Sequence, residues 1–248
     1  RYNVIQWVHR STRGWSYGGS ISDPRTGEII KGHVSLGSLR IRQDFLIAQA
    51  LQASYKNGKS DDEFALEMAL ARIRQLSAHE VGHTLGFAHN FAASTQNRAS
   101  VMDYPHPLIT VKGDRLDFSN AYAIGIGDWD KITVTYAYAE YPENESENLQ
   151  GVLDDAYSKG FRYISDSDAR AAGGAHAYAH LWDNGNDIVS ELNNVLEVRK
   201  FAINNFGLEN IKKDASYTSL EDLFVPLYFY HRYQTEAVSK IIGGLDYA

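Results

Sequence analysis

Three histidines and one glutamate between residues 79 and 90 have the types and the spacing to bind a metal ion and to use it. His79 and His83 are four residues apart, so on an α-helix their side chains lie on the same face. Two imidazoles placed in this way can both reach one Zn²⁺ ion. Glu80 follows the first histidine, which is the usual position of the general base in an H-E-x-x-H arrangement.

The residues after this helix provide a third ligand. Gly86 can adopt a positive φ angle without a Cβ penalty, so the helix can end there and the chain can turn sharply. The turn would bring His89 back to the same ion and leave the fourth position to water. Three protein ligands and one open position are typical of catalytic zinc sites. The chain has no cysteine, so its zinc ligands must be nitrogen or oxygen atoms.

The complete string is H-E-x-x-H-x-x-G-x-x-H, which should be followed by a methionine turn, and Met102 is available for one in residues 100–104. On these residues the chain resembles the metzincin clan of zinc endopeptidases. The resemblance implies that zinc is bound by His79, His83 and His89, with Glu80 as the base and Met102 beneath the metal. The alternative is a buried helix whose histidines bond to backbone carbonyls.

Two further parts of the site are implied by the resemblance. Tyr104 matches a tyrosine that swings onto or off the zinc in astacins and serralysins, and its hydroxyl could donate a hydrogen bond to the oxyanion. A tyrosine buried in the core is the alternative. Pro105 to Leu108 lies where the clan has the outer wall of its primary specificity pocket, so Pro105 and Leu108 are candidate substrate-binding residues. We interpret His106 as wall or surface rather than as a ligand.

The elements before the site are predicted from hydrophobic pattern. Residues 2–9, 14–22 and 28–36 are predicted to be strands, and the turn residues at 23–27 favour a hairpin between the second and the third. In metzincins an edge strand above the zinc helix pairs with the substrate. Gly18 and Gly19 would allow a peptide to approach such a strand closely. The alternative is an ordinary surface hairpin.

Helices are predicted over residues 40–55, 64–85 and 128–138. The second would begin after an N-cap at residues 60–63, would carry the ligands in its last turns, and would face the core with Phe64, Met68, Ala71 and Leu76. The expected fold class is therefore α/β (α+β): a metzincin-like domain with a small twisted mixed sheet and an active-site helix. The strand, helix and strand that normally open such a domain are missing from the sequence.

A mainly helical region is expected after the catalytic domain. Residues 142–148 are acidic and apolar-free, so we place a boundary there, with the catalytic domain at 1–140 and the helical region at 149–248. Residues 187–206 are predicted to form one helix and residues 219–242 another, kinked at Pro226. The pair His176 and His180 could suggest a second metal site but lacks supporting residues. Residues 183–187 are expected to form a turn with a helix cap rather than a calcium loop.

Composition limits the possible partners. The formal net charge of −7 argues against nucleic acid or an anionic membrane, and no run of 18 apolar residues is present. The chain begins at Arg1 without an initiator methionine or a signal peptide, so we expect it to be part of a longer polypeptide. Nearly the whole chain resembles uncharacterised, large bacterial metalloproteases, which implies a secreted, periplasmic or cell-surface location.

The predicted function is zinc-dependent hydrolysis of peptide bonds within a peptide or protein substrate. Two alternatives remain open. One is a catalytically idle module that only binds peptides, which the presence of Glu80 argues against. The other is a zinc hydrolase of a different bond, such as an ester or a peptidoglycan amide.

Overall fold

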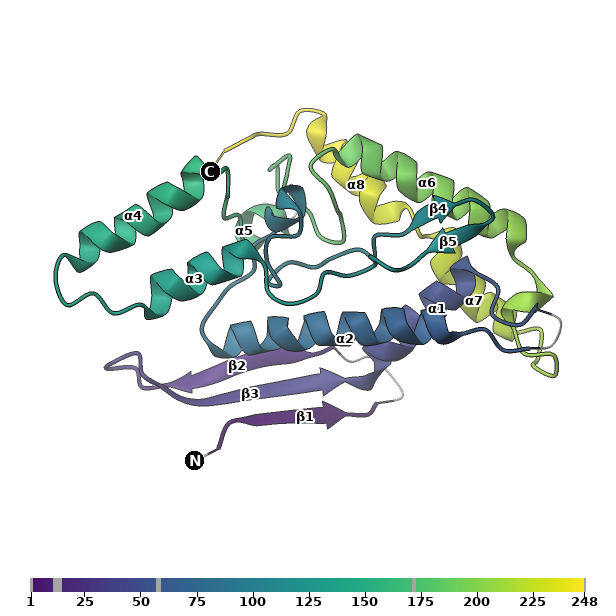
Figure 1. The fold of residues 1–248 in the computed structure, drawn as a ribbon, viewed down its shortest axis with the longest axis horizontal. Coiled ribbons are helices and arrows are strands. Elements are labelled where there is room, and N and C mark those ends of the chain that lie inside the picture. Colours follow the sequence, from purple (N-terminus) through teal and green to yellow (C-terminus); the bar gives the residue numbers. More distant parts are fainter. Residues whose placement is uncertain (1, 11–14, 57–58, 171–172, 248) are drawn as a thin grey trace.

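The computed structural model describes residues 2–10, 15–56, 59–170 and 173–247. A three-stranded sheet lies at one side of the molecule, one long helix runs alongside its strands, and the C-terminal helices lie beyond that helix (Figure 1). The predicted mixed class of helices with small sheets is confirmed. The long helix is therefore placed between the sheet and the rest of the chain.

The sheet contains β1 (Val4–Val8), β2 (Tyr17–Ser22) and β3 (Ile29–Gly37) in the order β1-β3-β2. β1 is parallel to β3, whereas β2 is antiparallel to it. The predicted hairpin is confirmed: Gly27 has a φ of 77° in the turn, and its N–H donates to the carbonyl oxygen of Asp23 at 2.8 Å. Gly14, where the second strand was predicted to begin, lies outside the described residues. β2 is left as an edge strand.

Two helices follow the sheet, α1 (Ser38–Leu51) and α2 (Glu63–Thr84). α1 ends earlier than the predicted 40–55 because the next residues bond elsewhere: the Gln52 side chain accepts from the N–H of Leu116, and the N–H of Tyr55 donates to the carbonyl of Glu209. α2 matches the predicted long helix. Its N-cap is Asp62 and its first turn contains the acidic Glu63, as predicted for residues 60–63, although the Asp62 side chain makes no capping hydrogen bond. Asn57 and Gly58, part of a predicted break, lie outside the described residues.

The core-facing side of α2 is largely as predicted. Met68 is buried in the core cluster, and Phe64 and Ala71 pack against this cluster while partly exposed. Leu76 is also buried, but it lines the cleft at the histidines. The opposite side of the helix lies on β2 and β3. α2 is thus held on two sides, which fixes the position of the ligands in its last turns.

A short hairpin, β4 (Thr110–Lys112) and β5 (Arg115–Asp117), leads to α3 (Asp128–Tyr138), which has the predicted bounds. The remaining elements are α4 (Glu145–Ser158), α5 (Asp166–Ala169), α6 (Ile188–Asn205), α7 (Ser219–Tyr228) and α8 (Arg232–Ile241), with 3-10 turns at Ala93–Gln96 and Leu208–Asn210. Asp187 caps α6 by accepting from the N–H groups of Val189 and Ser190, so the turn and cap predicted at 183–187 are confirmed.

Two predictions for this region are wrong. The stretch 145–148, predicted as linker, is the first turn of α4. The single kinked helix predicted over 219–242 is two helices, α7 and α8, and Pro226 lies inside the first. The break falls at Tyr230, whose ring is buried against His106 at a centroid distance of 4.9 Å. Burial of this ring, which the helical pattern does not reveal, coincides with the change of direction.

One hydrophobic cluster joins both halves of the chain. It contains Leu51 of α1 and Met68 of α2 together with Val195 of α6 and Leu227 of α7, all at most 2% exposed. Side chains from before and after the predicted boundary at 142–148 therefore pack in one core. The division into domains at 1–140 and 149–248 stays a prediction.

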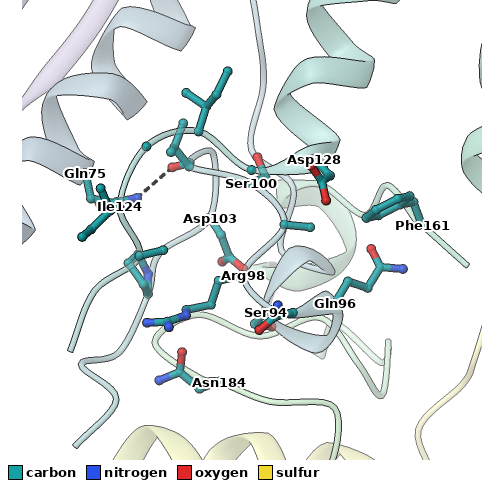
Figure 2. Close-up of a pocket in the computed structure, with 18 of the residues that line it drawn as sticks. Gln75, Ser94, Gln96, Arg98, Ser100, Asp103, Ile124, Asp128, Phe161 and Asn184 are labelled. Carbon is teal, nitrogen blue, oxygen red and sulfur yellow. Dashed lines mark hydrogen bonds between the residues drawn. The ribbon is translucent and has the colours of Figure 1, made fainter. Parts of the chain in front are cut away.

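A cavity of 280 Å³ lies beside residues 94–103 (Figure 2). Two buried carboxyl groups line it, those of Asp103 and Asp183. Burial raises the pKa of Asp103 to about 7, and burial together with the neighbouring charge of Asp103 raises the pKa of Asp183 well above its usual range. The three histidines predicted to bind zinc do not line this cavity.

Candidate metal centre

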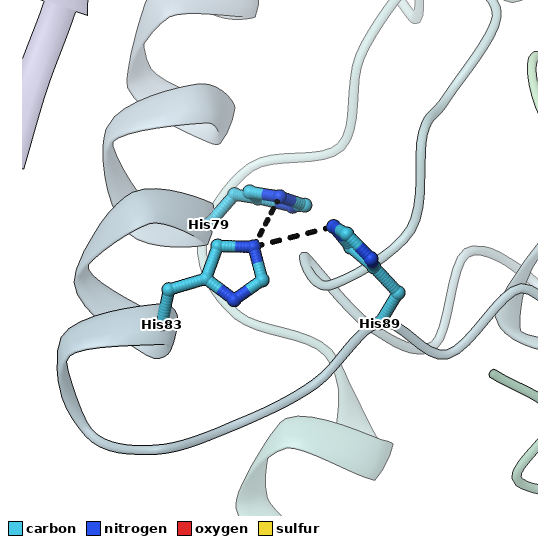
Figure 3. Close-up of side chains that lie close together, drawn as sticks. All are labelled: His79, His83 and His89. Carbon is cyan, nitrogen blue, oxygen red and sulfur yellow. Dashed lines mark hydrogen bonds between the residues drawn. The ribbon is translucent and has the colours of Figure 1, made fainter. Parts of the chain in front are cut away.

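The three predicted ligands converge at the end of α2. Gly86 has a φ of 89°, and the sharp turn that this allows brings His89 back toward His79 and His83 (Figure 3). The Nε2 atom of His83 lies 3.1 Å from that of His79 and 3.2 Å from that of His89. Nitrogen ligands at 2.0–2.1 Å from a tetrahedral zinc ion are about 3.3 Å apart. The spacing of the three nitrogens therefore fits a single ion.

The tautomers of the three imidazoles are fixed by their other nitrogens. The Nδ1 atoms lie 2.7 Å from the carbonyl oxygen of Val101, 2.8 Å from that of Phe87 and 2.7 Å from a carboxylate oxygen of Asp166. Because these partners are acceptors, each Nδ1 carries the proton and each Nε2 presents a lone pair. Three lone pairs that face one another make no hydrogen bond. A cation satisfies all three, which is the fit expected of a metal centre.

Burial also keeps the ligands in the form that binds metal. It lowers the pKa of His79 to about 3 and lowers that of His83. A neutral imidazole is the metal-binding form. In the part of the chain that the structure describes, His79, His83 and His89 form a group of three potential metal ligands.

The third ligand has a carboxylate partner that we did not predict. Asp166 lies on α5 and accepts a hydrogen bond from His89 through Oδ2, while its Oδ1 accepts from Arg170 Nη1 at 2.9 Å. Such a carboxylate fixes the orientation and raises the basicity of a ligating imidazole. It is 77 residues from His89 in sequence. The one local signal was an Asp and an Arg four residues apart, which is common on solvent-exposed helices.

Met102 lies directly against α2. A Cβ atom on Gly82 would be 2.4 Å from its sulfur, so the glycine in the middle of the helix makes room for the methionine. Asp130 of α3 holds this turn: its carboxylate accepts from the Ser100 hydroxyl at 2.6 Å and from the Val101 N–H at 2.9 Å. Since the Val101 carbonyl in turn binds His79, α3 positions a ligand through the methionine turn.

Glu80 lies where β2 packs against α2. Its carboxylate accepts the backbone N–H of Gly18, and burial raises its pKa to about 7. A Cβ atom on Gly18 would lie 1.9 Å from the carbonyl oxygen of Glu80, so only glycine allows the strand to approach the helix so closely. A Cβ atom on Gly19 would meet nothing within 4 Å. The edge strand thus passes directly beside the predicted base.

Tyr104 packs on the ligands. Its ring centroid lies 4.8 Å from that of His89, 5.6 Å from that of His79 and 5.2 Å from that of Trp182. Burial raises the pKa of its hydroxyl, which therefore stays protonated and able to donate. The side chain is half-buried at the cleft rather than enclosed in the core.

The residues predicted to form the wall of the specificity pocket lie in different places. Pro105 and the buried His106 line a cavity of 530 Å³ beside the site. Within the described residues, Leu108 lines neither this cavity nor the cleft at the histidines, and its N–H donates to the carbonyl of Ala121. His106 therefore belongs to a cavity wall, as we interpreted it.

The histidines at 176 and 180, four residues apart, lie outside the group of potential metal ligands found among the described residues. His176 is buried with its Nε2 atom 2.8 Å from the carbonyl oxygen of Tyr247, and His180 lies 3.6 Å from Glu236. The two side chains therefore have different partners.

The histidines, Glu80, Gly18 and Tyr104 all line one open cleft of 450 Å³.

Comparison with known proteins identifies a family that this chain matches. A family model described as Met-zincin matches residues 61–248, a stretch that contains the three histidines, Glu80 and Met102. No curated protein and no solved structure matches the chain. The family and the histidine triad together imply a metal ion, typically zinc.

Proposed function

This chain belongs to the Met-zincin family, and on that premise we propose that it is a zinc-dependent endopeptidase in which Glu80 is the general base. The observation that carries the proposal is the convergence of three imidazole lone pairs beside a buried carboxylate, in a cleft bordered by the edge strand β2. A zinc ion would be held by His79, His83 and His89. Bound zinc supplies the Lewis-acid chemistry of the site, since it polarises a carbonyl group and lowers the pKa of water.

The protein's own groups divide the remaining work. Glu80 takes the proton of the attacking water and delivers it to the leaving amine, for which a pKa near neutrality is suited. Tyr104 donates a hydrogen bond to the oxyanion that develops on the scissile carbonyl. The free edge of β2 pairs with the backbone of the substrate, with Gly19 facing open space.

The proposal is tested with zinc-loaded protein and a peptide library. We expect cleavage that is lost with a chelator and restored by zinc. Glu80→Gln should keep its zinc and fold and lose about 10²–10⁴-fold in rate, since that is the usual contribution of general acid–base catalysis. His83→Ala is the contrasting variant, because it should lose zinc and activity together. Cleavage by Glu80→Gln at the wild-type rate would exclude Glu80 as the base.

Two outcomes would favour the alternatives. Tight peptide binding without cleavage by the zinc-loaded protein would indicate a binding module, and cleavage of esters or peptidoglycan amides alone would indicate another hydrolase. Among the described residues no helix is both long and apolar enough to span a membrane. We also propose the secreted, periplasmic or cell-surface location on the basis of the family resemblance.

A further inference from the structure

A buried arginine in the catalytic cleft has no anionic partner. Arg72 lies on α2, on the same face as His79 and His83, and lines the cleft although it is only 3% exposed. Its Nη1 donates to the side-chain oxygen of Gln75, and its Nε has no hydrogen-bond partner. No carboxylate in residues 2–10, 15–56, 59–170 or 173–247 forms a salt bridge with it. Buried charges are normally paired, so this guanidinium calls for an explanation.

The neighbouring arginine shows what a structural pairing looks like in this protein. Arg40 of α1 lines the same cleft and binds Asp44 through two hydrogen bonds, of 2.7 and 2.8 Å. Asp44 also accepts the hydroxyl of Tyr122 at 2.7 Å, so its oxygens are already engaged. The cleft is therefore lined by two guanidinium groups and the carboxyl group of Glu80. Arg40 is paired with Asp44, whereas Glu80 interacts with the charge of Arg72 without forming a salt bridge to it.

Trp182 lies between the two arginines. Its ring centroid is 5.4 Å from the guanidinium carbon of Arg40 and 5.9 Å from that of Arg72. The backbone of Trp182 has a φ of 62°, a conformation that residues other than glycine rarely adopt. The backbone is held there by two bonds, from the Trp182 N–H to the Tyr104 carbonyl and from Gln234 to the Trp182 carbonyl. Strain of this kind is typical of ligand-binding positions.

The direction of the cleft places Arg72 on a defined side of the scissile bond. Gly18 lies against Glu80, and Gly32, which pairs with Ser20, lies against Thr84. β2 and α2 therefore run in the same direction. A substrate strand antiparallel to β2 runs the opposite way, from the C-terminal end of α2 toward its N-terminal end. The substrate residues that follow the scissile bond would then lie toward Leu76 and Arg72, both of which line the cleft.

We propose that this end of the cleft is a carboxylate-binding subsite, in which Arg72, supported by Arg40, binds a substrate carboxylate just after the scissile bond. The inference rests on the proposed endopeptidase function and adds the substrate class. An aspartate or glutamate side chain would supply the missing anion to the guanidinium group of Arg72. A neutral isostere would leave the buried charge unpaired, which is how such sites reject it. The same chemistry could come from the C-terminal carboxylate of a short substrate.

The test uses peptides that differ only in the residue after the scissile bond. We expect kcat/KM of the zinc-loaded protein to be about 10²-fold higher for Glu than for Gln, and likewise for Asp over Asn. Equal rates for the acid and the amide overturn the subsite. Peptides that end one residue after the scissile bond, as free acid or amide, separate the two sources. A preference confined to the free acids assigns the site to the chain terminus.

Variants connect the preference to Arg72. Arg72→Gln should abolish the preference for the acid while zinc content stays unchanged, because the charge is removed and the ligands are untouched. Arg42→Gln is the matched control, since Arg42 is an exposed arginine on the neighbouring α1 whose side chain is 66% accessible. Loss of the preference in both variants, or in neither, would contradict the assignment.

A binding measurement separates failure of the subsite from failure of the proposed function. The dissociation constants of the Glu and Gln peptides are measured on zinc-loaded Glu80→Gln, whose binding does not depend on catalysis. If no peptide is cleaved by the wild type, the endopeptidase proposal fails, and a Kd ratio of about 10² still supports the subsite. A Kd ratio near one overturns the subsite, whatever the rate of cleavage.

Discussion

The imidazole of His89 is held by a carboxylate, whereas the other two ligands are held by backbone carbonyls. Asp166 is therefore the side chain that can be changed to test how a ligand is oriented. Asp166→Asn should weaken zinc binding by about 10–100-fold, the usual effect of losing such a partner. Asp168→Asn is the control, because Asp168 lies on the same short helix and bonds to Tyr247 instead. If Asp166→Asn and the wild type compete equally well with a chelator for zinc, Asp166 does not contribute to zinc binding.

The hydroxyl of Tyr104 has two possible roles, and Tyr104→Phe isolates them from the packing of the ring. As an oxyanion donor, the hydroxyl should contribute about 10²–10³-fold to kcat, with KM and zinc content nearly unchanged. The three quantities kcat, zinc content and melting temperature are measured on one preparation. An unchanged kcat together with a lower melting temperature would assign the hydroxyl to stability rather than to catalysis.

At the scale of residues, the sequence predicts the groups whose spacing along one helix is itself the signal. His79, His83 and Glu80 belong to that class, and Gly86 extends it to His89. Asp166 and Arg72 do not. The role of Asp166 depends on its contact with a histidine 77 residues away, and that of Arg72 on the absence of a salt-bridge partner among the described residues. Neither property can be read from the spacing of residues along the chain.

β2 and α2 approach each other closely at Gly18, and the two adjacent glycines of β2 give a matched pair of variants. Gly18→Ala places a methyl group 1.9 Å from the Glu80 carbonyl oxygen, so strand and helix must separate. We expect a loss of about 1–3 kcal/mol in the free energy of unfolding and a large fall in activity. Gly19→Ala meets no atom within 4 Å and should be far milder. Denaturant unfolding compares the two. Equal losses would mean that the close approach is not needed.

At the scale of elements, prediction succeeds where periodicity and end signals agree. α3 has its predicted bounds, opened by Gly127 and Asp128, and α6 begins at its predicted cap. It fails in two places. The acidic residues 145–148 form a helical turn, and the burial of Tyr230 accompanies the break between α7 and α8. Local composition carries neither piece of information.

At the scale of the whole molecule, the buried carboxyls of Asp103 and Asp183 link the methionine turn to the C-terminal region and make stability depend on pH. Their folded pKa values are raised, whereas an unfolded Asp titrates near 3.9. Between about pH 4 and pH 7 the folded state therefore binds more protons than the unfolded state. The free energy of unfolding contributed by the pair falls as pH rises, by up to about 1.4 kcal/mol per pH unit and proton.

Asp183→Asn tests this linkage because an amide cannot ionise. The melting temperature of the variant relative to wild type should increase from pH 5 to pH 8. Comparison at each pH cancels the pH dependence of zinc binding, which both proteins share. The exposed Asp114→Asn variant should show no such trend. A difference between Asp183→Asn and wild type that is constant with pH would show that the pair does not titrate in this range.

The central claim is that His79, His83 and His89 bind one zinc ion and leave a position open for chemistry. X-ray absorption at the zinc edge measures this directly on the zinc-loaded protein. We predict three nitrogen ligands at about 2.0–2.1 Å and one further light-atom ligand from solvent. In His83→Ala the site should lose its zinc, while Glu80→Gln should retain the same first shell. Four protein ligands around the zinc, or an unchanged spectrum in His83→Ala, would contradict the account.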